Sequence, residues 1–568
     1  MANFKPSKYQ QAVYDEMLKA EHNLCISAVA GAGKTSTIVN AIDLLPAANS
    51  KVFLAFNKAI VEELKKKIKA SNTTIQTLHS AGFSAMMHTY KSKLDTYKYI
   101  NFLKDSIYIL SSTISVDTPN DEVSAFKSRV IKLLDLSRAG LLNNADDIAD
   151  CAMDHDIDLS GDEAEVVLKL MQWGIDQVAK IDFCDMIWIT VVKNLRVQTY
   201  DWVFIDECQD LSPMQNKLFQ MMIEPKDGKF IAVGDRAQSI QYFAGAGNDS
   251  FDNIANLPNT IELPLSICYR CPKAVVAKAK ELVPQIEAAD WAEDGIVETV
   301  FDLKKAKAGD MVLSRVTSEL VKCCMKYIRA GIPAYVKGQD IGNGLKSMIK
   351  RSKKTNINDL FTFLADELYK IQTATAKRLN ISMDEAKDNK RYIAFEDKIN
   401  TLSVIADGCE DTGAMILKID KLFKDNDKGI CFSTIHKSKG LEADNVFIIA
   451  LNKLPLKRAM KNPIQAQQEW NLAYVAYTRA KKALYLVDEE TSKIKNGLDR
   501  NAFNNFNNEE NVKESKDRKK MRQKVINFNE KAPKCENFTM KEGEVRSKIY
   551  WCKIIDKPCN FHNCPKNK

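Results

Sequence analysis

Near its N-terminus the sequence carries a loop of small residues that ends in a lysine and a threonine. The loop reads Ala28-Val29-Ala30-Gly31-Ala32-Gly33-Lys34-Thr35, and Ser36 follows it. An apolar run, Leu24-Cys25-Ile26, precedes the loop, and Thr37-Ile38-Val39 opens a helix-like segment after it. In a loop between a strand and a helix, backbone N–H groups bind phosphate, the lysine contacts the β- and γ-phosphates and the threonine hydroxyl ligates Mg²⁺. The loop therefore predicts a site for a nucleoside triphosphate, with Ala in place of the usual first Gly.

A pair of carboxylates follows another apolar run, Trp202-Val203-Phe204-Ile205, in the middle of the chain. Because the carboxyl ends of parallel strands meet at one edge of a sheet, Asp206 and Glu207 are expected beside the phosphate loop. There Asp206 would hold Mg²⁺ through water, together with Thr35, and Glu207 would polarise the water that attacks the terminal phosphate. With Lys34, this pair predicts ATP hydrolysis.

Short apolar runs that end in polar turns predict the strands that position these residues. They are Val52-Phe53-Leu54-Ala55, Trp202-Val203-Phe204-Ile205, Phe230-Ile231-Ala232-Val233, Met311-Val312-Leu313 and Val446-Phe447-Ile448-Ile449-Ala450. Two long stretches between them, residues 86–175 and about 346–425, are rich in Lys, Leu and Asp at helical spacing. The sequence therefore predicts an α/β fold with parallel sheets and two helical insertions.

The length of 568 residues is too great for one hydrophobic core and predicts several domains. A hydrophobic fraction of 45% and a charged fraction of 27% are ordinary for a globular protein. We find no apolar stretch close to the ~18 residues of a membrane span and no signal-peptide core at the start. We therefore expect a cytoplasmic protein without a membrane partner, whose 14 Cys are thiols or metal ligands.

The positive charge is concentrated at the C-terminal end. Residues 512–568 hold 16 Lys and Arg against 7 Asp and Glu, whereas the rest of the chain holds 66 against 67. A basic tail on a neutral body indicates either a polyanionic partner or a solvated, solubilising appendage. An Asn-rich stretch over residues 496–511 reads as part of a linker before this tail.

Four cysteines in the same tail have the character of metal ligands. They are Cys535, Cys552, Cys559 and Cys564, with His562 inside the last interval. Small segments with few apolar residues often need a metal to fold, and four thiolates suit tetrahedral Zn²⁺. The spacing is not a standard one, so an iron–sulfur cluster and unligated thiols stay open as alternatives.

Nine elements besides the phosphate loop resemble, in order, the motifs of the UvrD/Rep-like superfamily 1A DNA helicases. One of them is Asp206-Glu207-Cys208-Gln209-Asp210, which resembles the D-E-x-Q-D element. The others are Tyr9-Gln10-Gln11-Ala12-Val13, Phe53-Leu54-Ala55-Phe56-Asn57-Lys58-Ala59, Thr77-Leu78-His79-Ser80, Asp182-Phe183-Cys184-Asp185-Met186, Val233-Gly234-Asp235-Arg236-Ala237-Gln238-Ser239-Ile240, Tyr269-Arg270, Thr434-Ile435-His436-Lys437-Ser438-Lys439-Gly440-Leu441-Glu442 and Leu472-Ala473-Tyr474-Val475-Ala476-Tyr477-Thr478-Arg479-Ala480. The resemblance spans residues 4 to about 490.

The resemblance implies two RecA-like motor domains with ATP between them, each carrying a helical insertion. The expected boundaries are residues 1–85 and 176–262 for the first domain, 86–175 for its insertion, 263–345 and 426–490 for the second domain, 346–425 for its short insertion, 491–511 for a linker and 512–568 for the Cys-rich tail.

The same resemblance implies which residues bind the nucleotide. Gln10 would read the adenine, although Gln11 is an alternative match to the motif. Tyr269 would stack on the base. Glu442 and the loop with its flanks, residues 28–36, would complete the ATP site.

A second group is implied to act in hydrolysis. Gln238, Arg270 and Arg479 would join Lys34 and Glu207. Arginines from the opposite domain would stabilise charge on the γ-phosphate, so that hydrolysis requires a closed cleft. Domain closure would thereby be linked to the state of the nucleotide.

The implied track for single-stranded DNA needs aromatic rings for bases and donors for phosphates. Phe53 is expected in the core, whereas Phe56 lies in a loop before polar residues and is expected to be exposed. The candidate DNA contacts are Phe56, Asn57, His79, Tyr242, Phe243 and His436.

The sequence departs from the family pattern at several positions. Ser36 stands where the family often has an Arg that stacks on adenine, so Tyr269 is left to stack on one face alone. Ala244-Gly245-Ala246 replaces R-G-A, and Cys268 replaces the Asn before Tyr-Arg. The second insertion is also short, so processivity and regulation do not transfer from the family.

These inferences predict an ATP-dependent helicase that moves 3′ to 5′ on single-stranded DNA, with polarity taken from the resemblance. Single-stranded and tailed duplex DNA are the expected partners, with replication or repair proteins as further candidates and a nucleoid-associated location. Two alternatives remain: a DNA-dependent ATPase that displaces proteins or loads partners, and the motor subunit of a helicase–nuclease complex.

Overall fold

The computed structural model describes residues 5–155, 157, 159, 161–240, 250–424, 429–456, 459–460 and 463–488, and the backbone of three short strands after them. The chain divides into two units, residues 1–488 and 489–568, and each is described by itself. None of the helices in the described ranges has the length and apolarity needed to cross a membrane.

Six parallel strands form the first sheet of unit 1, in the order β3-β2-β6-β7-β1-β8. They are β1 Asn23–Ala28, β2 Lys51–Ala55, β3 Thr73–Thr77, β6 Trp202–Ile205, β7 Lys229–Gly234 and β8 Thr260–Leu265. Side chains of β1 alternate between two apolar clusters, because Leu24 and Ile26 belong to one and Cys25 to the other. The strand is therefore buried on both faces, as its continuous apolar run predicts.

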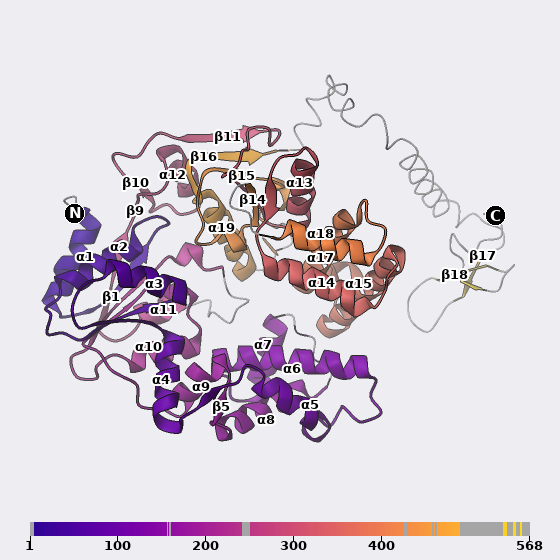
Figure 1. The fold of residues 1–568 in the computed structure, drawn as a ribbon, viewed down its shortest axis with the longest axis horizontal. Helices are drawn as coiled ribbons and strands as arrows, with labels where there is room; N and C mark the ends of the chain where they lie inside the picture. Colours follow the sequence, from indigo (N-terminus) through magenta and orange to yellow (C-terminus); the bar gives the residue numbers. More distant parts are fainter. Residues whose placement is uncertain are drawn as a thin grey trace. The chain divides into compact units, whose positions relative to one another are not determined.

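Helices cover both faces of this sheet (Figure 1). They are α1 Lys8–Lys19, α2 Lys34–Leu44, α3 Lys58–Lys67, α10 Pro213–Met221 and α11 Ser250–Ala255. Val13 and Ile38, from α1 and α2, pack in the same apolar cluster as Leu24, whereas Phe219 of α10 packs in the cluster of Cys25. The amphipathic helices thus bury one face each against the sheet.

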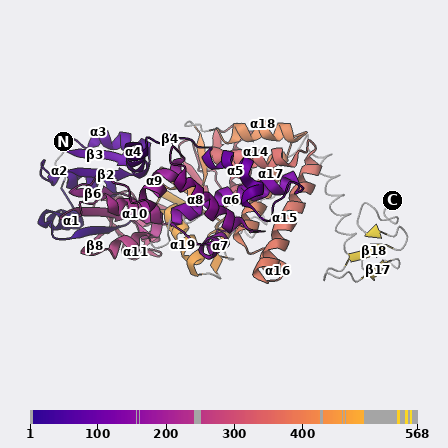
Figure 2. The same ribbon diagram turned by 90° about the horizontal axis from the view of Figure 1, so that it is seen from below.

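Between β3 and β6 the chain leaves the sheet and forms a helical group, drawn in purple in Figures 1 and 2. Its helices are α4 Leu78–Tyr90, α5 Lys98–Leu110, α6 Asn120–Gly140, α7 Ala145–Asp154, α8 Glu163–Asp176 and α9 Phe183–Val192, with the short parallel strands β4 Lys93–Leu94 and β5 Lys180–Ile181. Buried Asp185 of α9 accepts hydrogen bonds from Lys98 Nζ at 2.7 Å, Tyr99 Oη at 2.7 Å and Arg138 at 2.8 Å. Asp182 caps the start of α9. The carboxylates of the D-F-x-D element therefore hold α5, α6 and α9 together.

A second sheet of six parallel strands follows, in the order β11-β16-β15-β12-β14-β13. Its strands are β11 Ile296–Val300, β12 Met311–Ser314, β13 Ala334–Val336, β14 Ile430–Thr434, β15 Ala443–Ile448 and β16 Ala480–Val487, and the helices packed with it are α12 Lys273–Lys280, α13 Thr317–Arg329 and α19 Pro463–Tyr477. Two six-stranded parallel sheets confirm the predicted pair of RecA-like domains.

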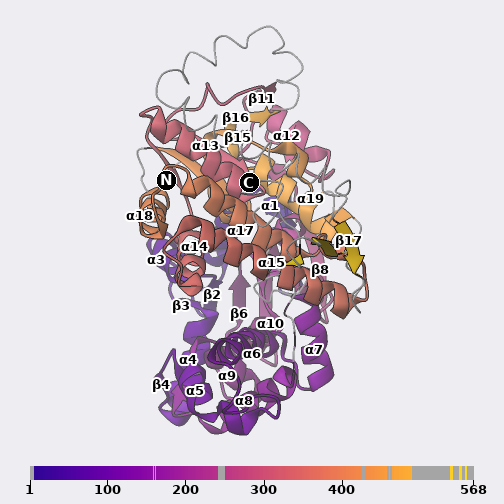
Figure 3. The same ribbon diagram turned by 90° about the vertical axis from the view of Figure 1, so that its right-hand side faces the viewer.

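The second helical insertion leaves this sheet between β13 and β14. It contains α14 Gln339–Ser352, α15 Ile357–Leu379, α16 Met383–Ala386, α17 Lys390–Ala406 and α18 Thr412–Leu422. Figure 3 shows α14, α15 and α17 beside one another. A two-stranded parallel sheet, β9 Ile267–Cys268 with β10 Glu287–Ala288, lies in the segment that joins the two large sheets.

Unit 2 is described only by the backbone of three antiparallel strands, β17 Phe538–Lys541, β18 Ile549–Cys552 and β19 Lys557–Pro558. Cys552 is the last residue of β18. The predicted linker and the other three cysteines of the tail, Cys535, Cys559 and Cys564, lie outside the described residues.

Candidate active site

The phosphate loop joins β1 to α2 in a conformation that requires glycine at two positions. Gly31 has φ +69° and Gly33 has φ +73°, both in the left-handed region. A Cβ on Gly31 would also lie 2.7 Å from the Cβ of Arg270, so no side chain fits there. The N–H of Tyr269 donates a hydrogen bond of 2.9 Å to the carbonyl oxygen of Gly31. The loop and the Tyr-Arg element therefore lie in direct contact.

Lys34 and Thr35 begin α2 and face the two carboxylates that follow β6. Nζ of Lys34 lies 3.0 Å from Oε1 of Glu207. The hydroxyl of Thr35 donates to Oδ2 of Asp206 at 2.7 Å. Glu207 has φ +54°, a left-handed conformation that is costly for any residue but glycine and is often found at functional sites.

The charges of this cluster depend on one another. Burial acts against the charge of Lys34, but Glu207, Asp206 and Asp235 outweigh it and raise the lysine pKa. Burial and the neighbouring Glu207 raise the pKa of Asp206. Burial also opposes ionisation of Glu207, but Lys34 and Lys439 lower the pKa of that carboxyl. Lys34 and Glu207 thus form an ion pair, and a bound triphosphate would have to take the place of Glu207 at the ammonium group.

Two glutamines connect the carboxylates around Lys34. Gln209 Nε2 donates to Glu207 at 2.6 Å, while its Oε1 accepts from the N–H of Asp235 at 3.0 Å. Gln238 Nε2 donates to Asp235 at 2.7 Å. Burial raises the pKa of Asp235 to about 6. One hydrogen-bonded chain therefore runs from Glu207 through Gln209 and Asp235 to Gln238.

Cationic side chains from the part of unit 1 that follows β8 lie beside the same site. Lys439, after β14, forms a short ion pair with Asp210 and donates to the carbonyl oxygen of Gln238 at 2.8 Å. Nη2 of Arg479 lies 3.5 Å from Oε1 of Gln238. Arg270 pairs with Glu442 at 2.7 Å.

Arg479 is almost completely buried, with 1% of its surface exposed. Its guanidinium donates to the carbonyl oxygens of Val475 at 2.9 Å and Leu441 at 3.2 Å. Burial, with Arg270 nearby, lowers its pKa to about 10. The group therefore stays charged at neutral pH and is held at the cleft by backbone acceptors.

At the other end of the phosphate loop, Gln10 and Gln11 differ in their burial and in their hydrogen-bond partners. Gln10 is buried and donates to Thr37 Oγ1 at 3.0 Å, whereas the side chain of Gln11 is exposed and bonds to Asp15. A Cβ on Gly33 would lie 3.8 Å from Nε2 of Gln10 and 3.6 Å from Cδ2 of Tyr269.

A cavity of about 430 Å³ lies beside the first sheet and is lined by two candidate residues of the DNA track, Phe56 and His79. Phe56 is 48% exposed and lines it with His79, whose pKa is lowered by burial. Phe183, which sequence analysis did not single out, is 54% exposed and lines the same cavity. Asn57 does not line it; its side chain caps α3 by accepting from Ile60 N–H at 3.0 Å.

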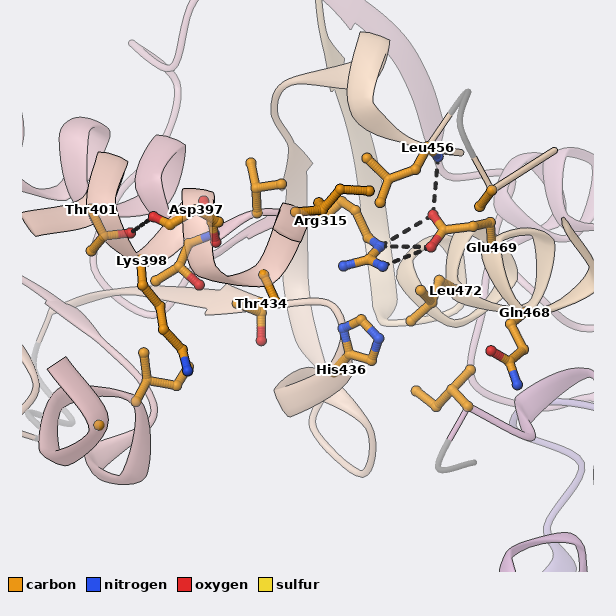
Figure 4. Close-up of a pocket in the computed structure, with 18 of the residues that line it drawn as sticks. Arg315, Asp397, Lys398, Thr401, Thr434, His436, Leu456, Gln468, Glu469 and Leu472 are labelled. Carbon is orange, nitrogen blue, oxygen red and sulfur yellow. Dashed lines mark hydrogen bonds and ion pairs between the residues drawn. The ribbon is translucent and has the colours of Figure 1, made fainter. Parts of the chain in front are cut away.

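A second cavity, of about 500 Å³, opens at the carboxyl ends of β12 and β14 (Figure 4). His436 lies in it opposite the bidentate ion pair of Arg315 with Glu469, whose N–O distances are 2.7 to 3.1 Å. Burial, with Arg315 and Lys437 nearby, lowers the pKa of His436 to about 3, so this imidazole is neutral. Lys398 of α17 lines the cavity as well.

Two protein-family models match the parts of the chain that form this site. The UvrD/REP helicase N-terminal domain matches residues 9–259, and the UvrD-like helicase C-terminal domain matches residues 429–487. The chain belongs to the UvrD/REP helicase family. This family consists of ATP-dependent DNA helicases, which agrees with the phosphate loop and the carboxylate pair.

Individual relatives of this UvrD-family chain are distant. It is 24% identical to F-box DNA helicase 1 of Gallus gallus, over 86% of this chain and 49% of that protein. It is 21% identical to the probable DNA helicase II homolog of Mycoplasma genitalium, over 80% of this chain and 81% of that protein. It is 30% identical to ATP-dependent DNA helicase UvrD1 of Mycobacterium leprae, but over only 26% of this chain and 20% of that protein. The chain thus spans about half the length of the first of these relatives.

Some predicted sites of this UvrD-family chain lie outside the described residues. These are Tyr242 and Phe243 of the DNA track and, in unit 2, the cysteines other than Cys552. Within the ranges that the structure describes, no group of three or more His, Cys, Asp or Glu side chains is arranged to hold a metal ion.

Proposed function

We propose that the chain is an ATP-driven motor that moves 3′ to 5′ on single-stranded DNA and unwinds tailed duplexes. The observation that carries this proposal is the contact of Lys439 and Arg479 with Asp210 and Gln238. These contacts join the strand ends of the second sheet to the hydrolytic residues of the first. A change at the terminal phosphate can therefore change how the two sheets pack.

The donor set fits Mg²⁺ with ATP. The Thr35 hydroxyl and the Asp206 carboxylate are 2.7 Å apart, and hard oxygen donors of this kind are what Mg²⁺ prefers. Thr35 and Asp206 would hold the ion, which would neutralise phosphate charge during hydrolysis. Lys34 would bind the β- and γ-phosphates, with the backbone of residues 28–36 around them.

Glu207 is proposed as the residue that orients and polarises the attacking water. When a triphosphate takes Lys34 from it, the carboxylate is released while Gln209 still holds it through the 2.6 Å hydrogen bond. Lys439 and the hydrogen bond from Gln209, which also lower the pKa of Glu207, would still favour the ionised carboxylate, which accepts a hydrogen bond from water.

Arg270 and Arg479 are proposed to stabilise the negative charge that develops on the terminal phosphate. Arg270 is held by Glu442 and lies against Gly31, so it is already at the loop. Gln238 would report the phosphate to Arg479, since its amide touches both Asp235 and that arginine.

Single-stranded DNA is proposed to run along the cavity that contains Phe56 and the cavity that contains His436. Phe56 and Phe183 offer exposed rings for stacking, and His79 and His436 offer neutral imidazoles for hydrogen bonds. Tyr242, Phe243 and Asn57 remain proposed contacts from the resemblance.

The test is ATP hydrolysis with and without a single-stranded oligonucleotide. The wild type should be strongly stimulated. Lys34→Ala should lose turnover and keep DNA binding, and Glu207→Gln should keep ATP binding and lose hydrolysis. Turnover in Lys34→Ala at the wild-type rate would refute the site. Displacement of streptavidin from DNA without strand separation would favour a protein-displacing translocase.

We further propose that the basic tail binds DNA and holds a zinc ion through Cys535, Cys552, Cys559 and Cys564. Deleting residues 512–568 should leave basal hydrolysis intact, weaken DNA binding and flatten its salt dependence, because each neutralised phosphate releases counterions. Elemental analysis of the full chain should give about one zinc per chain. Absence of metal, or an unchanged salt slope, would refute the respective part.

A further inference from the structure

Trp291 is a large aromatic side chain in an unusual position, because 75% of its surface is exposed. Its indole is not isolated. It stacks on the ring of Tyr269, with the ring centroids 5.7 Å apart and the planes inclined by 17°. Because single exposed apolar side chains are common on protein surfaces, the stacking on Tyr269 and not the exposure alone sets Trp291 apart.

The pairing of two short strands places Trp291 beside Tyr269. Strands β9 and β10 run parallel, with Glu287 opposite Ile267 and Ala288 opposite Cys268. Tyr269 and the turn that contains Trp291 therefore leave the same end of this small sheet. The turn is closed by a hydrogen bond of 2.9 Å from the N–H of Ala292 to the carbonyl oxygen of Ala289.

The same segment is tied to the helix that carries Gln10. The hydroxyl of Tyr9 donates to Glu287 of β10 at 2.5 Å, and Lys8 lies 3.8 Å from the other oxygen of that carboxylate. The neighbour of Tyr9, Gln10, donates to Thr37 of α2, and its Nε2 would lie 3.8 Å from a Cβ on Gly33 of the phosphate loop. Trp291, Tyr269 and Gln10 are thus held together at one end of that loop.

Ser36, in the first turn of α2, offers little to a nucleobase. Ser36 is exposed, and its hydroxymethyl group presents no planar surface. A base that leaves the loop at this end would find its aromatic surface on the side of Tyr269 and Trp291.

We propose that Trp291 is a positioning residue for the nucleobase of ATP: its indole backs the Tyr269 ring and fixes the face on which adenine stacks. The proposal rests on the ATPase function proposed above. Stacked aromatic pairs contribute modestly, so removal of the indole should act on nucleotide affinity rather than on the chemical step.

The experiment measures DNA-stimulated hydrolysis by the full chain as a function of ATP and of CTP concentration. Trp291→Ala should raise the KM for ATP by about three- to tenfold, with kcat changed less than twofold, and should affect CTP less because a pyrimidine stacks over a smaller area. Trp291→Phe should stay within about twofold of wild type because a ring is retained. Trp470→Ala removes another exposed tryptophan, 42% exposed on α19, and is the matched control.

Tryptophan fluorescence on binding of ADP gives an independent result that needs no turnover. It compares the wild type with Trp291→Phe, so it can be obtained even if Trp291→Ala does not fold. ADP should change the tryptophan emission of the wild type, and the change should be absent from Trp291→Phe. A KM for ATP within twofold of wild type in Trp291→Ala, an equal rise in Trp470→Ala, or an emission change that survives in Trp291→Phe would overturn the proposal. A wild type that neither binds nor hydrolyses ATP would instead refute the proposed function.

Discussion

The backbone N–H of Ala30, inside the phosphate loop, donates a hydrogen bond of 2.8 Å to the hydroxyl of Tyr474, which lies 444 residues later in the chain. Both residues are completely buried. Tyr474 belongs to α19, the helix that ends just before Arg479. One hydrogen bond therefore joins the loop proposed to bind phosphate to the helix that leads to an arginine proposed to act on it.

Tyr474→Phe should loosen this connection. The ring is kept, but the N–H of Ala30 loses its buried acceptor, which costs about 1–3 kcal/mol. Hydrogen exchange of the phosphate loop, followed by mass spectrometry, should become roughly 5- to 150-fold faster if it occurs through this local opening. Tyr477→Phe, on the same helix but with its ring near Lys278, is the control and should leave the exchange unchanged. Unchanged exchange in Tyr474→Phe would mean that the bond does not hold the loop.

Arg479→Ala should reduce turnover by about 10³-fold or more, with a much smaller effect on nucleotide affinity, because the arginine is proposed to act on charge that develops during hydrolysis. Arg270→Ala should behave in the same way. Since Arg479 also satisfies two buried carbonyl oxygens, Arg479→Lys serves as a second variant that keeps the charge. Single-turnover rates and ATP dissociation constants separate the two effects. A loss confined to affinity would contradict the assignment.

Phe183→Ala should lower DNA-stimulated hydrolysis and single-strand affinity while leaving basal hydrolysis near the wild-type value. Stacking on an exposed ring contributes about 1–3 kcal/mol per base, which corresponds to roughly 5- to 150-fold in affinity. Phe183 is the first residue of α9 and its side chain is largely exposed, so its removal leaves little cavity. Phe183→Tyr, which retains a ring, should restore binding. Equal loss of basal and stimulated rates would indicate a folding defect instead of a lost DNA contact.

Stability should fall in acid partly because of His436. Its pKa is lowered in the folded chain to about 3, whereas an unfolded chain binds a proton near pH 6.5. The folded state is therefore not penalised above pH 6.5 and loses stability progressively as the pH falls from there toward 3. His436→Gln, which cannot titrate, should show a shallower fall in the thermal midpoint between pH 6.5 and 4. Parallel profiles for both proteins would exclude this contribution.

Several features were readable from the sequence because they depend on local pattern. The continuous apolar run Leu24-Cys25-Ile26 requires two buried faces, and the structure supplies them. Phe53 is buried and Phe56 exposed, as their places in a strand and in the following loop predict. The burial of Gln10 was also accessible, since Gln10, Val13 and Met17 lie on one face of a helix that begins at Lys8, after its N-cap Ser7.

Contacts between distant segments were not readable in this way. No periodicity links Lys439 to Asp210, which are 229 residues apart, or Ala30 to Tyr474. Phe183 was overlooked as a DNA contact because buried residues of α9 follow it directly. The structure shows that this first helical residue is exposed. Motifs therefore identified the chemistry, whereas the pairing of the two sheets had to come from the structure.

Strand displacement on two duplexes that differ only in the polarity of their single-stranded tail tests the central claim most directly. With ATP and Mg²⁺, the wild type should separate the duplex with a 3′ tail and leave the one with a 5′ tail intact, and Lys34→Ala should separate neither. Separation of the 5′-tailed duplex alone would contradict the proposed direction. Failure on both duplexes by a protein that hydrolyses ATP on DNA would contradict the proposal that this motor unwinds DNA.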